Sequence, residues 1–159
     1  MGWFDTALIC ENGHVVTDSL KNSPQFATKY CEKCGAKTIK ECPNCNTDIR
    51  GYYHIEGVFS AGHKKAPNYC HECGQPYPWT KAKIEEFKAV VQELEELNEE
   101  EREKLTNSIE DIIKDTPRTD RAILFIRKIS SKVKEKTWKV VKAILIKVAT
   151  EYVKQQLGL

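Results

Sequence analysis

The chain has 159 residues, of which 40% are hydrophobic and 30% charged, and its net charge at pH 7 is +2. This is the composition of an ordinary soluble protein, and the length suffices for one or two small domains. No segment reaches the run of about 18 apolar residues that a membrane-spanning helix needs, so such a helix is excluded.

The first half of the chain holds all seven cysteines. Six of them form three Cys-x-x-Cys pairs, and the seventh stands four residues before a histidine. Two cysteines separated by two residues can place both sulfurs about 2.3 Å from one zinc ion. Eight ligands complete two structural Zn²⁺ sites and leave no thiol for chemistry. The predicted ligands are Cys10, His14, Cys31, Cys34, Cys42, Cys45, Cys70 and Cys73.

Other roles of these cysteines fit less of the sequence. The odd cysteine number, the abundant lysine and the lack of a secretory signal disfavour a disulfide framework. A redox Cys-x-x-Cys usually stands alone beside a βαβ pattern, which this sequence lacks. Iron in a four-cysteine site stays open, because such a site uses the same ligands.

Two groupings of the ligands are compatible with the spacing. The sequential grouping, which we favour, joins the first four ligands in one site and the last four in the other, as in consecutive zinc ribbons. The cross-braced grouping joins the first pair with the third and the second with the fourth. His54 or His63 is an alternative to His14 as the eighth ligand, whereas His71 is expected to point outward.

Residues 1–79 are therefore predicted to form a double zinc-ribbon domain. The segment is short and broken by glycine and proline, so metal substitutes for a hydrophobic core and the domain should be unfolded without it. Short strands are expected at Thr6–Ile9, Val15–Val16, Lys37–Ile39, Gly51–Ile55 and Gly57–Ser60.

An α-helical domain is predicted over residues 80–159, where cysteine and histidine are absent and apolar residues recur at helical spacing. Thr80 is the expected N-cap of a helix over about 81–97, and Asn98 with Glu101 forms a capping box for a helix over about 99–115.

Pro117 opens the last segment, which is predicted as one long basic amphipathic helix over about 118–157. Ser130–Ser131 and Glu135–Thr137 are the candidate points of a bend or break in it. The fold class predicted for the whole chain is α+β.

Charge is segregated within the helical part. Residues 80–116 carry 6 basic and 12 acidic side chains, whereas residues 117–159 carry 11 basic and 3 acidic ones. This pattern favours packing of oppositely charged helices, within one chain or between copies. Alternatively, the basic helix binds nucleic-acid phosphates or lies on an anionic membrane. The candidate contact residues are Arg118, Arg121, Arg127, Lys128, Lys132, Lys134 and Lys136.

Aromatic side chains near the predicted knuckles are candidates for partner contacts. Arg50, Tyr52, Tyr53 and Tyr69 are the residues that we expect to face a partner, with Arg50 and Tyr52 foremost. Tyr77 and Trp79 are more readily explained by packing against the knuckles and the first helix.

Catalysis has little support in this sequence. A catalytic zinc needs an open coordination position, and the predicted ligands come in complete sets of four. No nucleophile with an adjacent base and no phosphate-binding glycine loop is present. We therefore expect no enzyme and no small-molecule substrate.

Several stretches of the chain resemble a bacterial family of small double-zinc-ribbon proteins with a helical tail, a domain of unknown function. The resemblance covers most of residues 1–80 and implies bound zinc and a bacterial, cytoplasmic origin, but no activity or partner. The stretches that carry it are Gly2–Thr6, Ile9–Cys10, Asn12–His14, Cys31–Thr38, Cys42–Cys45, Ile49–His54, Tyr69–Gly74, Pro76–Thr80, Glu99–Leu105 and Asp115–Thr119.

The sequence as a whole predicts a cytoplasmic, non-enzymatic zinc-binding protein that acts in interaction or assembly. Its zinc ribbons would present a recognition surface, and its helices would form a homo-oligomer or dock a protein partner. The alternatives are a nucleic-acid-binding regulator and a protein that associates with a membrane surface.

Overall fold

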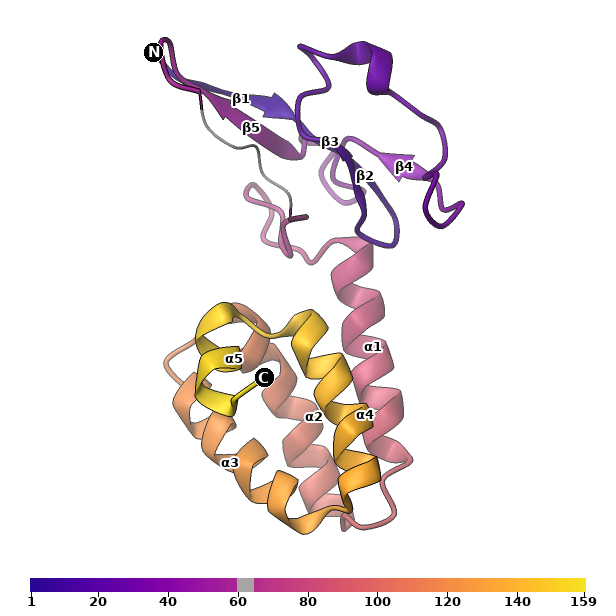
Figure 1. The fold of residues 1–159 in the computed structure, drawn as a ribbon, viewed down its shortest axis with the longest axis vertical. Coiled ribbons are helices and arrows are strands. Elements are labelled where there is room, and N and C mark those ends of the chain that lie inside the picture. Colours follow the sequence, from indigo (N-terminus) through magenta and orange to yellow (C-terminus); the bar gives the residue numbers. More distant parts are fainter. Residues whose placement is uncertain (60–64) are drawn as a thin grey trace. The chain divides into compact units, whose positions relative to one another are not determined.

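The computed structural model describes residues 1–59 and 65–159 (Figure 1). Its residues form two compact units, Met1–Lys81 and Ala82–Leu159. His63, an alternative metal ligand, and Ser60, the end of an expected strand, lie outside the described residues.

The first unit contains two small antiparallel sheets. One is a two-stranded ribbon of β1 (Trp3–Thr6) and β5 (Arg50–His54), in which Trp3 lies opposite His54. The other has the strand order β3-β2-β4 and is formed by β2 (Leu8–Cys10), β3 (Val15–Thr17) and β4 (Thr38–Ile39). A short 3-10 turn, Pro24–Phe26, lies between β3 and β4.

The strands differ from the expected ones at two places. The expected strand Thr6–Ile9 is divided between β1 and β2, which belong to different sheets. The described part of the expected strand Gly57–Ser60 is not a strand, because Gly57 has a φ of 74° and the chain reverses direction there. An isolated β-bridge between Ile55 and Val58 closes this turn.

A small apolar core fills the first unit, and two of its members are cysteines. It contains Ala7, Ile9, Cys42, Ile49, Cys70, Tyr77 and Trp79. The rings of Tyr77 and Trp79 stack with their centroids 4.7 Å apart, and the Trp79 indole N–H donates to the Pro67 carbonyl at 2.8 Å. Both side chains are only 1% exposed, as their predicted packing role requires.

Helix α1 (Pro78–Gln92) begins earlier and ends earlier than the helix expected over about 81–97. The proline ring of Pro78 fixes its φ near the value that the first residue of a helix needs. The Tyr77 carbonyl accepts hydrogen bonds from the N–H groups of Thr80 and Lys81, both at 3.0 Å. After Gln92 the chain continues in tight turns, so that Leu94 and Leu97 are buried outside the helix.

Helix α2 (Glu99–Lys114) has a complete capping box at its start. The Asn98 side chain accepts from the Glu101 N–H at 2.9 Å, and the Glu101 carboxylate accepts from the Asn98 N–H at 3.1 Å. The apolar stripe of α2, which includes Leu105, Ile109 and Ile112, is fully buried.

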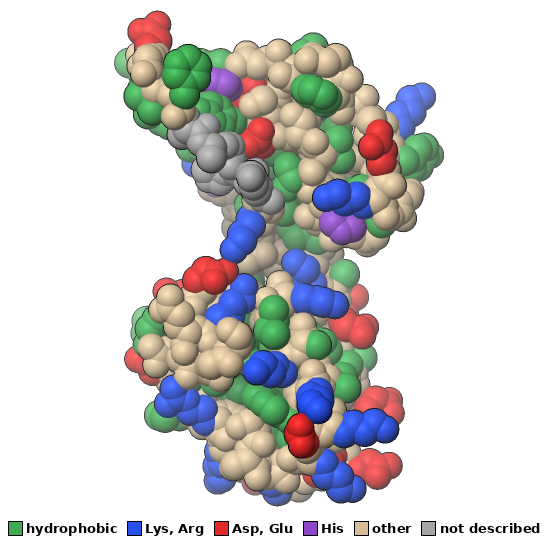
Figure 2. All heavy atoms as spheres, viewed as in Figure 1, with side chains coloured by type: hydrophobic (Ala, Val, Ile, Leu, Met, Phe, Trp, Pro, Cys, Tyr) green, Lys and Arg blue, Asp and Glu red, His purple; other side chains and the backbone are tan. Residues whose placement is uncertain are grey.

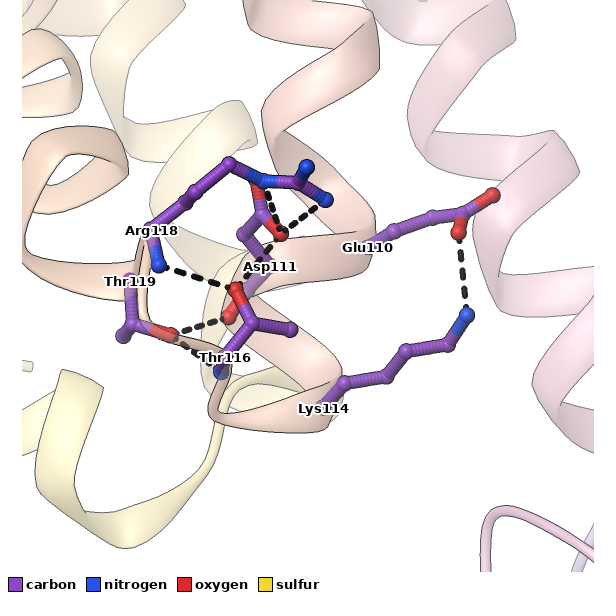
Figure 3. A network of polar contacts seen from close by, with 6 residues as sticks. All are labelled: Glu110, Asp111, Lys114, Thr116, Arg118 and Thr119. Carbon is purple, nitrogen blue, oxygen red and sulfur yellow. Dashed lines mark hydrogen bonds and ion pairs between the residues drawn. The ribbon is translucent and has the colours of Figure 1, made fainter.

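The corner between α2 and α3 (Thr119–Lys132) is fixed by polar contacts around one carboxylate (Figure 3). Asp111 accepts two hydrogen bonds from the Arg118 Nε, both at 3.2 Å, and one from the Thr116 hydroxyl at 2.7 Å. The Thr119 hydroxyl donates to the Asp111 carbonyl at 2.6 Å. The basic segment is thus tied to the acidic one.

The segment over 118–157 is three helices and not the single long helix expected. They are α3, α4 (Glu135–Val148) and α5 (Glu151–Leu157). The breaks fall at Val133–Lys134 and Ala149–Thr150, where all four residues have extended backbone with ψ between 149° and 160°.

Burial explains why the segment breaks. An unbroken helix of 40 residues would be about 60 Å long and would leave much of its apolar stripe in water. In three pieces, the segment buries Ile126, Leu145 and Val153 completely. The Thr150 side chain accepts from the Val153 N–H and caps α5. Helix α4 has no side-chain cap, and the Thr137 hydroxyl in its first turn donates to the Glu96 carboxylate at 2.9 Å.

The predicted α+β class is confirmed, with short antiparallel strands followed by helices. Within the described residues, none of the helices is both long and apolar enough to cross a lipid bilayer.

Replacing Asn98 by alanine should lower the free energy of unfolding by about 1 kcal/mol, because the Glu101 N–H loses its acceptor. Urea unfolding of the metal-loaded chain, followed by far-ultraviolet circular dichroism, measures this change. Asn107→Ala, an exposed position inside α2, is the matched control and should be neutral or slightly stabilising. Equal losses in the two variants would refute the cap.

Candidate metal centres

Three Cys-x-x-Cys turns in the first unit have the same backbone hydrogen bonds. In each turn the carbonyl of the first cysteine accepts a hydrogen bond from the N–H of the residue four positions later. The N–H of the same cysteine donates a hydrogen bond to the carbonyl of the residue five positions later. These bonds are 2.7–2.9 Å long in the turns that begin at Cys31, Cys42 and Cys70. An isolated β-bridge flanks each turn, so every knuckle is the tip of a minimal hairpin.

One position in each turn requires a left-handed backbone. Gly35, Asn46 and Gly74 occupy it, with φ values of 71°, 59° and 69°. Glycine adopts this conformation without strain, and asparagine is the next most tolerant residue. The sequence therefore specifies the three turns locally.

The fourth knuckle is the turn of the β2–β3 hairpin and carries Cys10 and His14. Gly13, with a φ of 86°, donates its N–H to the Cys10 carbonyl at 2.7 Å, and the Cys10 N–H donates to the His14 carbonyl at 3.0 Å. This turn is one residue shorter than the other three, and it brings the imidazole back over the cysteine sulfur.

The knuckles bring the eight predicted ligands together in two groups of four. One group is Cys10, His14, Cys31 and Cys34, and the other is Cys42, Cys45, Cys70 and Cys73. Within each group all ligand atoms lie within 4.8 Å of one another. This is the sequential grouping, and the cross-braced grouping is not present in the structure.

The distances within each group match a tetrahedral metal site. Around a zinc ion with Zn–S bonds of about 2.3 Å, sulfurs are about 3.8 Å apart. The structure has sulfur pairs at 3.7 Å (Cys10 and Cys34), 3.8 Å (Cys42 and Cys73) and 3.7 Å (Cys45 and Cys70). A disulfide needs about 2.05 Å, and all seven cysteines are free.

The imidazole of His14 joins the first group through Nδ1. This atom lies 3.6 Å from the Cys10 sulfur and 3.7 Å from the Cys31 sulfur. A tetrahedral edge between sulfur and nitrogen is about 3.6 Å for the usual Zn–S and Zn–N bonds. The residues of both groups therefore fit a four-coordinate ion, and they would leave no open position on it.

Hydrogen bonds from N–H groups to the sulfurs stabilise the thiolate form of two of the cysteines. Hydrogen bonds from the Ala36 N–H and the Asn12 side chain lower the pKa of Cys34 to about 6. Burial alone would raise the pKa of Cys70, but the N–H groups of Cys73 and Glu72 outweigh it and lower the value to about 6.

Each group also contains a thiol that stays protonated at neutral pH without metal. Burial raises the pKa of Cys42 to about 11, against hydrogen bonds from the backbone amides of Asn44 and Cys45. Burial likewise raises the pKa of Cys10. A cation that binds must displace these protons, because only the thiolate is a ligand.

The two groups differ in how deeply they are embedded. Cys42 and Cys70 belong to the apolar core, beneath the stacked rings of Tyr77 and Trp79. In the first group Cys34 is exposed, and its sulfur accepts a hydrogen bond from the Asn12 amide at 3.4 Å. The second group thus shares two ligands with the core, whereas the first group combines the buried Cys10 and Cys31 with a ligand, Cys34, that reaches the surface.

Trp79 also contacts the first knuckle. A Cβ added at Gly13 would lie 3.0 Å from the Cβ and Cγ atoms of Trp79, so glycine is required there for packing as well as for its positive φ. The Trp79 side chain therefore adjoins the knuckle of the first group and also packs in the core that contains Cys42 and Cys70 of the second group.

The remaining described histidines lie outside both groups. The His54 ring stacks on Trp3 at 4.2 Å, and its Nε2 lies 3.3 Å from the buried carboxylate of Asp5. Hydrogen bonds from the Lys21, Thr6 and Asn22 amides outweigh burial and lower the pKa of Asp5. His71 is exposed.

The ribbon residues proposed to contact partners lie together on β5. Arg50 is exposed, with its guanidinium carbon 4.7 Å from the centre of the Phe4 ring, and Tyr53 packs on Phe4 at 4.6 Å. Tyr52 is half-buried against His54. Tyr69 is also half-buried, one residue before Cys70, and is not part of the ribbon.

Three of the basic candidates are engaged inside the second unit. Arg118 binds Asp111, Lys132 binds Glu101 with Nζ–O distances of 2.6 and 2.7 Å, and Arg127 donates to the Gln156 carbonyl. The exposed candidates Arg121 and Lys128 make no such contact with a described residue. Oppositely charged helix packing thus accounts for part of the charge pattern.

The cysteine spacing did not reveal several contributors to the site. Asn12, the glycine at position 13, Trp3 and Phe4 were identified from the sequence only within the stretches that resemble the bacterial family. Their roles depend on Cys34, Trp79 and β5, which are distant in sequence.

Replacing His14 by alanine should weaken zinc binding at the first group by about a hundredfold, since one ligand of four supplies about 3 kcal/mol. The second group should keep its affinity, because its four ligands are intact. Elemental analysis of the wild type should give two ions per chain, and chelator competition measures both affinities. His71→Ala is the control; a loss with His54→Ala but not with His14→Ala would move the eighth ligand.

Acid should weaken metal binding more steeply below about pH 6. There the thiolate of Cys70 also takes up a proton, so the second group, whose ligands are all cysteines, must release one further proton when it binds the ion. The slope of log affinity against pH should rise by about one at this group, measured by chelator competition between about pH 5 and 8. A constant slope would contradict the assignment.

Comparison with known proteins gives one match. No curated protein and no solved structure is significantly similar to the chain. A protein family described as an uncharacterized protein conserved in bacteria, DUF2321, matches residues 3–157. The match extends over both units and confirms the resemblance to a bacterial family of unknown function. The chain belongs to the DUF2321 family of bacterial proteins.

Proposed function

We propose that the protein is a non-enzymatic zinc-binding module that presents the β1–β5 ribbon to a protein partner. Zinc is the ion favoured by a Cys₃His and a Cys₄ donor set at tetrahedral distances, and such closed sites are structural. A partner protein rather than a small substrate is supported by the lack of an open coordination position and by the exposed apolar side chains of the ribbon.

The ribbon carries the proposal because its apolar side chains point into solvent. On the two strands the exposed ones are Trp3 (44%), Phe4 (41%) and Tyr53 (39%). The segment directly after β5, which we include in the ribbon surface, adds Ile55 (48%), Val58 (53%) and Phe59 (103%). Figure 2 shows hydrophobic side chains gathered at this end of the first unit. Clusters of this kind on a soluble protein mark interaction sites, and aromatic side chains and arginine supply most of the binding energy there.

The ribbon is held in shape before any partner binds. Gly51 is fully packed, because a Cβ there would lie 2.0 Å from the Asp18 carbonyl oxygen, and the Tyr52 N–H donates to that oxygen at 2.7 Å. The rings of Trp3 and His54 stack, as do the Arg50 guanidinium and the Phe4 ring. A rigid surface loses little conformational entropy on binding, which favours recognition.

Removing exposed apolar area from the ribbon should abolish partner capture. Trp3→Ser with Phe59→Ser takes away two exposed rings that no described core residue needs. We expect the wild-type chain, cross-linked in its bacterial host, to retain a protein that this variant loses. Sedimentation of the purified chain distinguishes a second copy from a different protein.

Phe26→Ser with Tyr30→Ser is the matched control, since these rings are 57% and 63% exposed in the same unit but outside the ribbon. It should retain the partner, and both variants should keep two metal ions. Retention of the same protein by the ribbon variant, or recovery of the wild type alone as a monomer, would refute the proposal.

A further inference from the structure

A groove between α2 and α3, with a volume of about 650 Å³, lies within the second unit and is large enough for a small ligand. The small buried residues Ser108 of α2 and Ala122 of α3 both line it. The other lining residues include Lys104 and Asn107 of α2 and Arg121, Phe125 and Lys128 of α3.

Cationic side chains outnumber acidic ones in the lining of the groove. Four cationic side chains and one carboxylate line it, and that carboxylate, Asp111, is neutralised by Arg118 (Figure 3). Lys104 is paired with Glu100 at 2.5 Å. Arg121 and Lys128 have no ion pair with a described residue, although Glu101 attracts Lys128 at longer range. Two exposed charges are therefore available to an anion.

The two available charges flank an aromatic ring. Arg121, Phe125 and Lys128 are spaced by four and three residues on α3, so they lie on one face of the helix. The rise of a helix places the outer two about 10 Å apart. Phe125 is half-buried and lines the same groove. A ligand that extends along this face of α3 contacts the Arg121 guanidinium, the Phe125 ring and the Lys128 ammonium group in succession.

Nucleotides offer the complementary chemistry. Arginine and lysine bind phosphate oxygens, and a base stacks on an aromatic side chain whatever its sequence. The exposed amide of Asn107, on the opposite wall, both donates and accepts hydrogen bonds and can meet a base edge. A purely apolar ligand would leave the charges unmatched, and an acidic peptide would leave the ring without a stacking partner.

We propose that the α2–α3 groove binds a ligand of nucleotide chemistry, with phosphates on Arg121 and Lys128 and a base on Phe125. The site lies in the helical unit and does not depend on the ribbon surface. A single-stranded nucleic acid and a free nucleotide share this chemistry, so the experiment includes both.

Fluorescence anisotropy of a labelled single-stranded oligonucleotide with the metal-loaded full chain tests the groove. Arg121→Glu with Lys128→Glu should weaken binding more than tenfold and lower the salt slope by about 1.4, since each lost phosphate contact on a single strand contributes about 0.7. Phe125→Leu keeps apolar packing but removes stacking, and should weaken binding about fivefold or more. Lys139→Glu with Lys147→Glu makes the same charge change on α4 and should have less than about a twofold effect.

Each outcome decides a point. Displacement of the oligonucleotide by AMP, but not by inorganic phosphate, would assign the groove to free nucleotides, and failure of AMP to compete would assign it to a strand. No binding at about 50 mM salt, an equal loss in the α4 control, or an unaffected Phe125→Leu variant would overturn the proposal. Far-ultraviolet circular dichroism checks folding, and Arg121→Gln with Lys128→Gln replaces the glutamate variant if that variant unfolds.

Discussion

The convergence of the Cys42 and Cys70 turns is the constraint on which the first unit depends. Its apolar core is small, and two of its members are cysteines of the second candidate metal centre. Four cysteine ligands that lie within 4.8 Å of one another can all be thiolates only when a cation offsets their charge. The stack of Tyr77 on Trp79, the turn at Gly13 and the first turn of α1 all adjoin this point.

The two units differ in how much apolar surface they bury. The helical unit buries complete apolar stripes, so that side chains such as Leu105, Ile126 and Leu145 are fully inaccessible. The first unit has a smaller core, and its two groups of four ligands could add metal coordination to it. It can therefore leave Trp3, Phe4 and Tyr53 outside, where another surface can meet them. Exposure of the ribbon aromatics is compatible with folding because they contribute little to the core.

The sequence predicted what local backbone chemistry specifies. Cysteine spacing with Gly35, Asn46 and Gly74 sets the knuckles, and Asn98 with Glu101 sets the start of α2. Features that join distant segments were not predictable in this way. The first turn of α4 contacts Glu96, 41 residues before Thr137, and the ribbon depends on the pairing of β1 with β5. Periodicity alone indicated a continuous helix there because both sides of the break are apolar at the same spacing.

The sequential grouping of ligands has a consequence for synthesis of the chain. The first group is complete once Cys34 has left the ribosome, and the second takes its ligands only from Cys42 onward. The two stretches do not overlap, so the first centre can be filled while the second is still being made. Chains emerge and fold from the N-terminus. Metal loading can thus follow the order of translation, without exchange of thiols between the two centres.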